Sequence, residues 1–154
     1  MYEISISFAN NSAKLNGGAV SISDGDINFE GAVNFGGSSD TLKNTASGNG
    51  GALCATGGNI TFSSTSNFGN NTAENGGALY IAGGKPSFKG KATFTNNLAE
   101  TNGGAIYFEG RANNLSSVFS AAATFTGNKT TDRGGPVCCF LPVRHERPSQ
   151  RPLI

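Results

Sequence analysis

Few residues in this chain have the types and spacing that catalysis or metal binding requires. The closest acidic pair is Asp24 and Asp26, in the sequence Ser-Asp-Gly-Asp. Two such carboxylates could contact a calcium ion, but Asp-Gly-Asp is also ordinary turn sequence, since Asp and Gly tolerate the backbone angles of tight turns. We interpret the pair as a turn, with a calcium contact as the alternative. The sequence predicts no catalytic residue, no metal site and no cofactor.

The cysteines and the single histidine give no clearer site. Cys54, Cys138 and Cys139 are odd in number, and the adjacent pair cannot form an ordinary unstrained disulfide with itself. His145 has no cysteine or carboxylate at a spacing suited to zinc. We therefore infer neither a disulfide framework nor a zinc site.

Charge is too sparse to attract a polyanion. Charged residues form 14% of the chain and the formal net charge is +1, whereas nucleic acids and anionic membranes require clustered Lys and Arg. The closest basic group is formed by Lys85, Lys89 and Lys91. We interpret these side chains as pointing alternately in and out of a strand, with Lys89 and Lys91 on a solvated face. We predict no nucleic-acid partner and no small-molecule substrate.

What recurs instead is a motif, Phe-x-x-Asn followed about six residues later by Gly-Gly and a small residue. Its first part is formed by Phe8 and Asn11, Asn44, Phe68 and Asn71, Phe94 and Asn97, and Phe125 and Asn128. Its second part is formed by Gly17 and Gly18, Gly50 and Gly51, Gly76 and Gly77, Gly103 and Gly104, and Gly134 and Gly135. The second copy has an insertion after Phe35, and in the fifth copy Pro136 replaces the alanine.

The elements that must position this motif are short strands. The Gly pairs recur at separations of 33, 26, 27 and 31 residues, which indicates a solenoid, and the units are rich in Gly, Asn, Ser, Thr and Phe, which disfavour helices. Apolar and polar residues alternate, and another Phe precedes the motif Phe by six residues in four units. We predict an all-β fold, a right-handed parallel β-helix of four to five coils with three strands per coil. Stacking then places the Phe residues in two internal ladders, the Asn residues in one ladder at a corner, and the Gly pairs at sharp corners.

The composition changes after residue 135. Four of the five prolines and the only His lie beyond it, and proline cannot donate to a strand ladder. We divide the chain into a β-helical repeat region, 1–135, and an irregular Pro/Arg-rich tail, 136–154. The tail is interpreted as a disordered segment or out-of-frame translation of a longer gene, with a cap or partner-binding segment as the alternative.

The two parts of the motif, recurring in fixed order over residues 1–135, resemble the repeats of the chlamydial polymorphic membrane proteins, a family of autotransporter-like surface proteins. The resemblance implies a fragment of an exported passenger domain whose parent lies at the cell surface or outer membrane and adheres to host cells through a host cell-surface receptor. We expect the chain itself to lack a signal peptide and a membrane anchor.

Three functions remain open at this point. The first is a fragment of an adhesin, which truncation could leave without independent activity, and the second is a structural stalk without binding activity. The third is a carbohydrate-active β-helix enzyme, for which the clustered acidic and basic residues are missing. Among the motif residues we expect only the asparagines to face a partner, and we expect end-to-end self-association because no cap for the terminal coils is recognisable.

Overall fold

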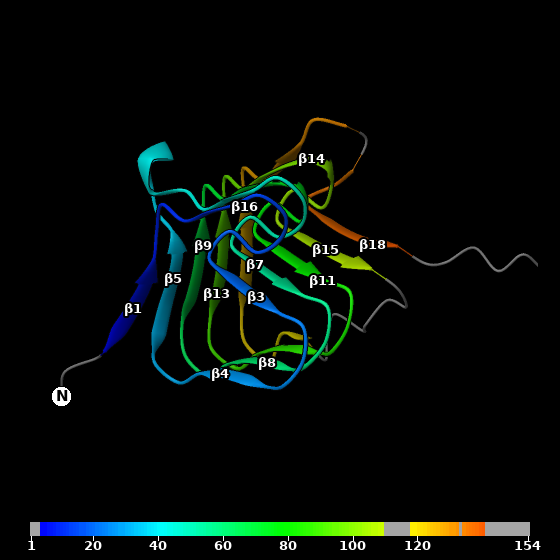
Figure 1. The fold of residues 1–154 in the computed structure, drawn as a ribbon. Helices are drawn as coiled ribbons and strands as arrows, with labels where there is room; N and C mark the ends of the chain where they lie inside the picture. Colours follow the sequence, from blue (N-terminus) through cyan, green and yellow to red (C-terminus); the bar gives the residue numbers. More distant parts are fainter. Residues whose placement is uncertain (1–3, 110–117, 133, 141–154) are drawn as a thin grey trace, which may run out of the picture.

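A computed structural model describes residues 4–109, 118–132 and 134–140, and of residues 138–140 it describes the backbone alone. The described chain consists of short strands and one short 3-10 helix, η1 (Asp40–Leu42). Paired strands run parallel and come from successive repeats. In the first three repeats the chain passes through the same four sheets, and the coils stack as a parallel β-helix, as predicted (Figure 1).

The four sheets are named here A to D in the order in which each coil visits them. Sheet A contains β1 (Ser5–Phe8), β5 (Ala32–Gly36), β9 (Ser66–Gly69), β13 (Ala92–Thr95) and β16 (Ala123–Thr126). Sheet B contains β2 (Ser12–Ala13), β6 (Thr45–Ala46), β10 (Thr72–Asn75), β14 (Leu98–Asn102) and β17 (Lys129–Thr130). Sheet C contains β3 (Val20–Ile22), β7 (Leu53–Ala55), β11 (Leu79–Ile81), β15 (Ile106–Glu109) and β18 (Val137–Phe140). Sheet D contains β4 (Ile27–Phe29), β8 (Ile60–Phe62) and β12 (Pro86–Phe88).

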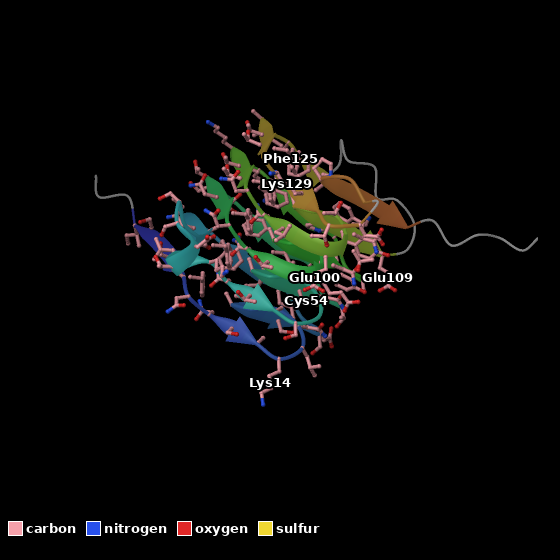
Figure 2. The ribbon with its side chains drawn as sticks, turned by 90° about the horizontal axis from the view of Figure 1, so that it is seen from above. Lys14, Cys54, Glu100, Glu109, Phe125 and Lys129 are labelled. Carbon is pink, nitrogen blue, oxygen red and sulfur yellow. The ribbon has the colours of Figure 1, made fainter. Side chains whose placement is uncertain are left out.

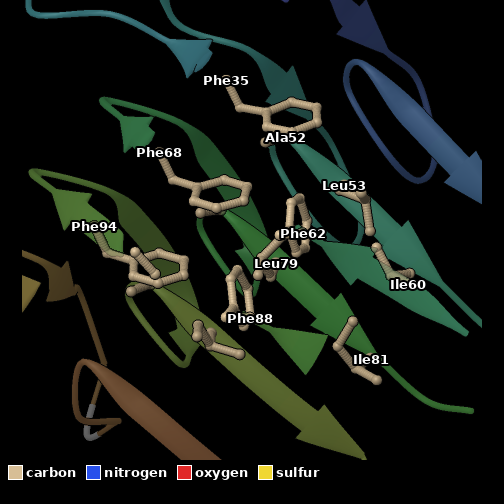
Figure 3. Close-up of a cluster of buried hydrophobic side chains, with 14 of the residues drawn as sticks. Phe35, Ala52, Leu53, Ile60, Phe62, Phe68, Leu79, Ile81, Phe88 and Phe94 are labelled. Atoms are coloured by element: carbon tan, nitrogen blue, oxygen red, sulfur yellow. The ribbon is translucent and has the colours of Figure 1, made fainter. Parts of the chain in front are cut away.

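The interior is filled by two columns of phenylalanine, as the sequence predicts. The first column stacks from sheet A with centroid separations of 4.7 to 5.1 Å and nearly parallel rings. It contains Phe8, Phe35, Phe68, Phe94 and Phe125. The second column contains Phe29, Phe62, Phe88 and Phe119. Rings of the two columns meet edge to face, as Figure 3 shows for Phe62 and Phe68, which is a favoured arrangement of aromatic quadrupoles.

Each of the first three coils contains four strands rather than the predicted three. The missed element is sheet B, which follows the motif Asn and is only two residues long in three of its five coils. Its alanines Ala46, Ala73 and Ala99 are buried. An element of this length with Ala as its apolar residue gives no alternation signal, and this explains why sequence periodicity missed it.

The regular stack also continues beyond the predicted boundary at residue 135. Strand β18 pairs in parallel with β15, so the predicted division at 135/136 lies too early by at least the length of this strand. Pro136 is tolerated because the stack needs only its carbonyl, which accepts hydrogen bonds from the N–H groups of Ala105 at 2.8 Å and Ile106 at 3.2 Å. The rest of the predicted tail, 141–154, lies outside the described residues.

Candidate functional site

The motif asparagines form a continuous hydrogen-bonded column along one corner of the stack. From Asn11 to Asn128, each side-chain Nδ2 donates to the Oδ1 of the next Asn at 2.9 to 3.0 Å. The same Oδ1 also accepts the backbone N–H of the preceding Asn, and from Asn44 onward each Nδ2 donates to the carbonyl of a motif Phe or its equivalent. One side chain thereby joins three coils.

This geometry overturns the expectation that the asparagines face a partner. Asn44, Asn71 and Asn97 are 0% exposed, and their polar atoms are used within the stack. A buried amide is stable only when its donors and acceptors are paired, and the column pairs them. The motif Asn is therefore a structural residue of the corner.

The two glycines of the motif have different roles. The first has positive φ in four coils, for example +67° at Gly50, where its Cβ would lie 2.2 Å from the Leu53 carbonyl oxygen. The second is required by close approach, since a Cβ on Gly51 would lie 2.2 Å from the Gly77 carbonyl oxygen. In the fifth coil neither Gly134 nor Gly135 has positive φ, so this copy keeps the sequence of the corner without its backbone conformation.

A second column of asparagines was missed in the sequence. It consists of the residue immediately before each of the first four Gly pairs, namely Asn16, Asn49, Asn75 and Asn102. Asn75 Nδ2 donates to Asn49 Oδ1 at 3.1 Å, and Asn102 Nδ2 donates to Asn75 Oδ1 at 2.9 Å. The recurring Asn-Gly-Gly triplet was the available signal, and it identifies a second supporting column at the sheet B–sheet C corner.

The outer face of sheet C carries a small cluster of buried reactive groups. Cys54, Tyr80 and Tyr107 pack together, and the Tyr80 hydroxyl donates to Glu109 Oε2. Burial raises the pKa of the Cys54 thiol to about 11, and burial together with the Glu109 hydrogen bond and charge raises the pKa of Tyr80. Both groups are therefore neutral at physiological pH, and Cys54 is a poor nucleophile.

The other residues considered for chemistry are accounted for by turns. Asp24 Oδ1 accepts the N–H of Gly25, and Asp26 Oδ1 accepts both the N–H and the Nδ2 of Asn59. Lys85, Lys89 and Lys91 are exposed and lie outside the strands, so their predicted alternation along one strand is wrong. Among the residues that the structure describes, no group of three His, Cys, Asp or Glu side chains could hold a metal ion. Cys138 and Cys139 lie in β18, whose side chains there are not described, and His145 lies outside the described residues.

An open groove of about 530 Å³ lies on the outer face of sheet A. It crosses the strands of several coils and is bordered by the insertion that follows Phe35, through Gly37, Ser38 and Leu42. Its lining within sheet A and the adjoining corner consists of Ser7, Asn34, Gly36, Asn67, Phe68, Gly69, Asn70, Thr93, Thr95 and Asn96. This groove was not predicted from the sequence, although a polar residue directly precedes each motif Phe of sheet A.

Charged side chains lie around the stack rather than in a common site. Viewed from above, Lys14 extends from the first coil and Lys129 lies toward the opposite end of the stack, while Glu100 lies between them in β14 of sheet B and Glu109 lies at the side of sheet C (Figure 2). Within the described ranges, no helix is long and apolar enough to cross a membrane.

Comparison with known proteins agrees with the repeat structure. No curated protein and no solved structure matches the chain. The Chlamydia polymorphic membrane protein (Chlamydia_PMP) repeat matches residues 5–23, 42–56 and 91–109. Each matched range contains one Asn of the corner column and the following Gly pair, and runs into a strand of sheet C. Three segments of the chain, each within a stacked coil, therefore match the repeat of the Chlamydia polymorphic membrane proteins.

Proposed function

We propose that this chain is part of the surface-exposed passenger of an autotransporter and that it acts in adhesion to host cells. The observation that supports the proposal is the coincidence of the three family matches with stacked coils of a parallel β-helix. The family implies a parent protein at the outer membrane or cell surface, and an elongated stack suits a passenger because it carries many lateral faces away from the membrane. The proposal assigns no catalytic role to any residue.

Contact with a receptor must use residues that the motif does not contain. The middle motif residues are buried, including Phe35, Phe68 and Phe94 in the core and the asparagines at the corner. The outward side chains of the sheets, and the turns between strands, differ from coil to coil. The packing beneath them recurs in successive coils and holds their spacing near 4.8 Å per coil. The motif therefore supplies a scaffold, and the variable outer positions supply recognition.

The test is saturable binding of the folded chain to epithelial cells. The chain is immobilised, its β-sheet content is verified by circular dichroism, and cell attachment is measured against surface density, with competition by the soluble chain. Attachment that saturates and is competed by the soluble chain supports adhesion. A folded chain to which cells attach no better than to an unrelated β-sheet protein refutes it.

A stalk without binding activity is the second candidate, and the burial of the motif favours it. Every middle-coil residue of the motif is used inside the stack, which is what a spacer alone would require. If the chain is a stalk, cells attach to the unsubstituted chain only at background level, and substitutions on the outer faces of the sheets leave that level unchanged. The same assay therefore separates the two candidates.

A further inference from the structure

The groove on sheet A has a floor built from outward positions of successive coils. Ser7, Asn34, Asn67 and Thr93 occupy equivalent positions in the register of β1, β5, β9 and β13. Beside them, Gly36 and Gly69 are paired in register, so the floor is hollowed where two neighbouring coils carry no side chain. The insertion after Phe35 raises a wall over this hollow. The groove is therefore bordered by the insertion that interrupts the repeat within the second coil, between β5 and β6.

Its polar groups are amides and hydroxyls with spare hydrogen-bonding capacity. Asn67 Nδ2 donates to Asn34 Oδ1 at 2.8 Å, which fixes both side chains across two coils. Within the described part of the chain, Asn34 Nδ2 and Asn67 Oδ1 have no hydrogen-bond partner, which leaves a donor on one side chain and an acceptor on the other. Ser7, Thr93 and Thr95 add hydroxyls, each both donor and acceptor. The site is thus pre-organised for a ligand whose own groups both donate and accept.

The lining excludes other ligand classes. Among the residues that the structure describes, no charged side chain lines the groove, so none of them attracts an anion or a cation there. Among the described lining residues, Leu42 is the exposed large apolar side chain, and it can cover one face of a ring. A peptide adding as a strand needs a free sheet edge, whereas here the backbone of β9 is paired to β5 and β13 on both sides.

We propose that this groove binds a neutral oligosaccharide, lying across the strands along the stack, with sugar hydroxyls bonded to Asn34 and Asn67 and an apolar ring face on Leu42. Sugar hydroxyls are uncharged, donate and accept at once, and border weakly apolar ring faces, so they match each property of the lining. The inference deepens the proposed adhesive function, because it names a surface glycan as the ligand of the host cell.

The first experiment uses the full chain on an array of immobilised neutral oligosaccharides ending in galactose, glucose, fucose or N-acetylhexosamine, with sialylated and sulfated glycans beside them. The strongest neutral glycan is then titrated by isothermal calorimetry against Asn67→Ala, Leu42→Ala and the control Thr61→Ala. Thr61 lies in β8 of sheet D, away from the groove, and its substitution tests for a general effect of losing a surface hydroxyl.

The expected result is selective binding of neutral glycans, weakened about tenfold by Asn67→Ala through lost hydrogen bonds and unchanged by Thr61→Ala. Weakening by Leu42→Ala places the sugar under the insertion. Binding of no neutral glycan, binding of sialylated or sulfated glycans alone, or equal loss in Thr61→Ala each overturns the proposal.

A second measurement separates this inference from adhesion itself. Epithelial cells are treated with glycosidases that remove neutral glycans or with protease, and attachment of the chain and of Asn67→Ala is compared. Loss of attachment after glycosidase supports the groove as the site. Attachment that survives glycosidase and is abolished by protease overturns the glycan and leaves adhesion standing, with a protein receptor in its place. Absence of attachment to untreated cells, with glycan binding intact on the array, refutes adhesion and leaves the groove standing.

Discussion

The middle coils and the terminal coils carry the same motif, but a middle coil has a neighbouring coil on both sides and a terminal coil has one on a single side. In the middle, Phe68 is stacked between Phe35 and Phe94 at 5.1 and 4.7 Å, and Asn71 is bonded to Asn44 and Asn97. In the first and last coils, Phe8, Phe125, Asn11 and Asn128 are half-buried, and Ile4 and Ile6 of the first coil are 77% and 47% exposed. A motif residue is therefore stabilised by the coils on both sides of it, so its contribution to folding depends on its place in the stack.

The largest difference is expected for phenylalanine. Phe68→Ala removes a buried ring between two stacked neighbours and should lower the free energy of unfolding by about 4 kcal/mol. Phe125→Ala removes a half-buried ring with one stacked neighbour in its column and should cost about 1 to 2 kcal/mol. Urea unfolding followed by circular dichroism measures both, with Phe68→Leu as an intermediate. Equal losses at the two positions would contradict the comparison.

The corner asparagines should show a smaller difference between middle and terminal coils, again with the larger loss of unfolding free energy in the middle. Asn71→Ala removes the acceptor of the Asn44 N–H and of one Asn44 Nδ2 hydrogen, and the side-chain donor to the Phe35 carbonyl, in a buried site at a cost of about 3 kcal/mol. Asn11→Ala removes an amide from the half-buried edge of the column, at a cost of about 1 kcal/mol. The same urea titration tests the pair, and a loss at Asn11 as large as that at Asn71 would show that the column does not act through burial.

The terminal coils also lead us to propose end-to-end association of the chain. β1 is the edge strand of sheet A, with Ile6 exposed within it and Ile4 exposed directly before it, a combination that favours pairing with another copy. Replacing both isoleucines with Lys should weaken association by about tenfold, or 1.4 kcal/mol. Sedimentation velocity over a concentration series measures it, with Thr61→Lys as the control for added charge. A chain that stays monomeric at high concentration before any substitution would refute the proposal.

The smallest expected effect concerns a single serine in the middle of the stack. Ser66 is paired in register with Val33 and Ala92, and its Oγ is buried without a hydrogen-bond partner in the described structure. Ser66→Ala removes this unpaired hydroxyl and should be neutral or raise the free energy of unfolding by up to about 1 kcal/mol. Thermal unfolding measures it, and a clear decrease in stability would show that the hydroxyl has a partner.

The inner half of this molecule was predictable and the outer half was not. Phe68 and Phe94 each precede a Gly pair by nearly the same offset, eight and nine residues, so their stacking follows from the repeat. Sheet B escaped prediction because its strands are too short to alternate, and the stack beyond Gly135 escaped because Pro136 was judged by the N–H it lacks rather than by the carbonyl it keeps. The groove escaped for another reason: it is bordered by an insertion, and a periodic pattern contains no information about the residues that interrupt it.

The corner column of asparagines also has an electrical direction. Every side-chain amide from Asn11 to Asn97 donates toward the next coil, so the amide dipoles add head to tail and polarise one another. The sum resembles a helix macrodipole made of side chains, with partial negative charge at the Asn11 Oδ1 and partial positive charge at the amide hydrogens of Asn128. Two such columns extend one another only in the same orientation. The stack therefore has a direction, and a further coil or a second copy can extend the column at either end in only one orientation.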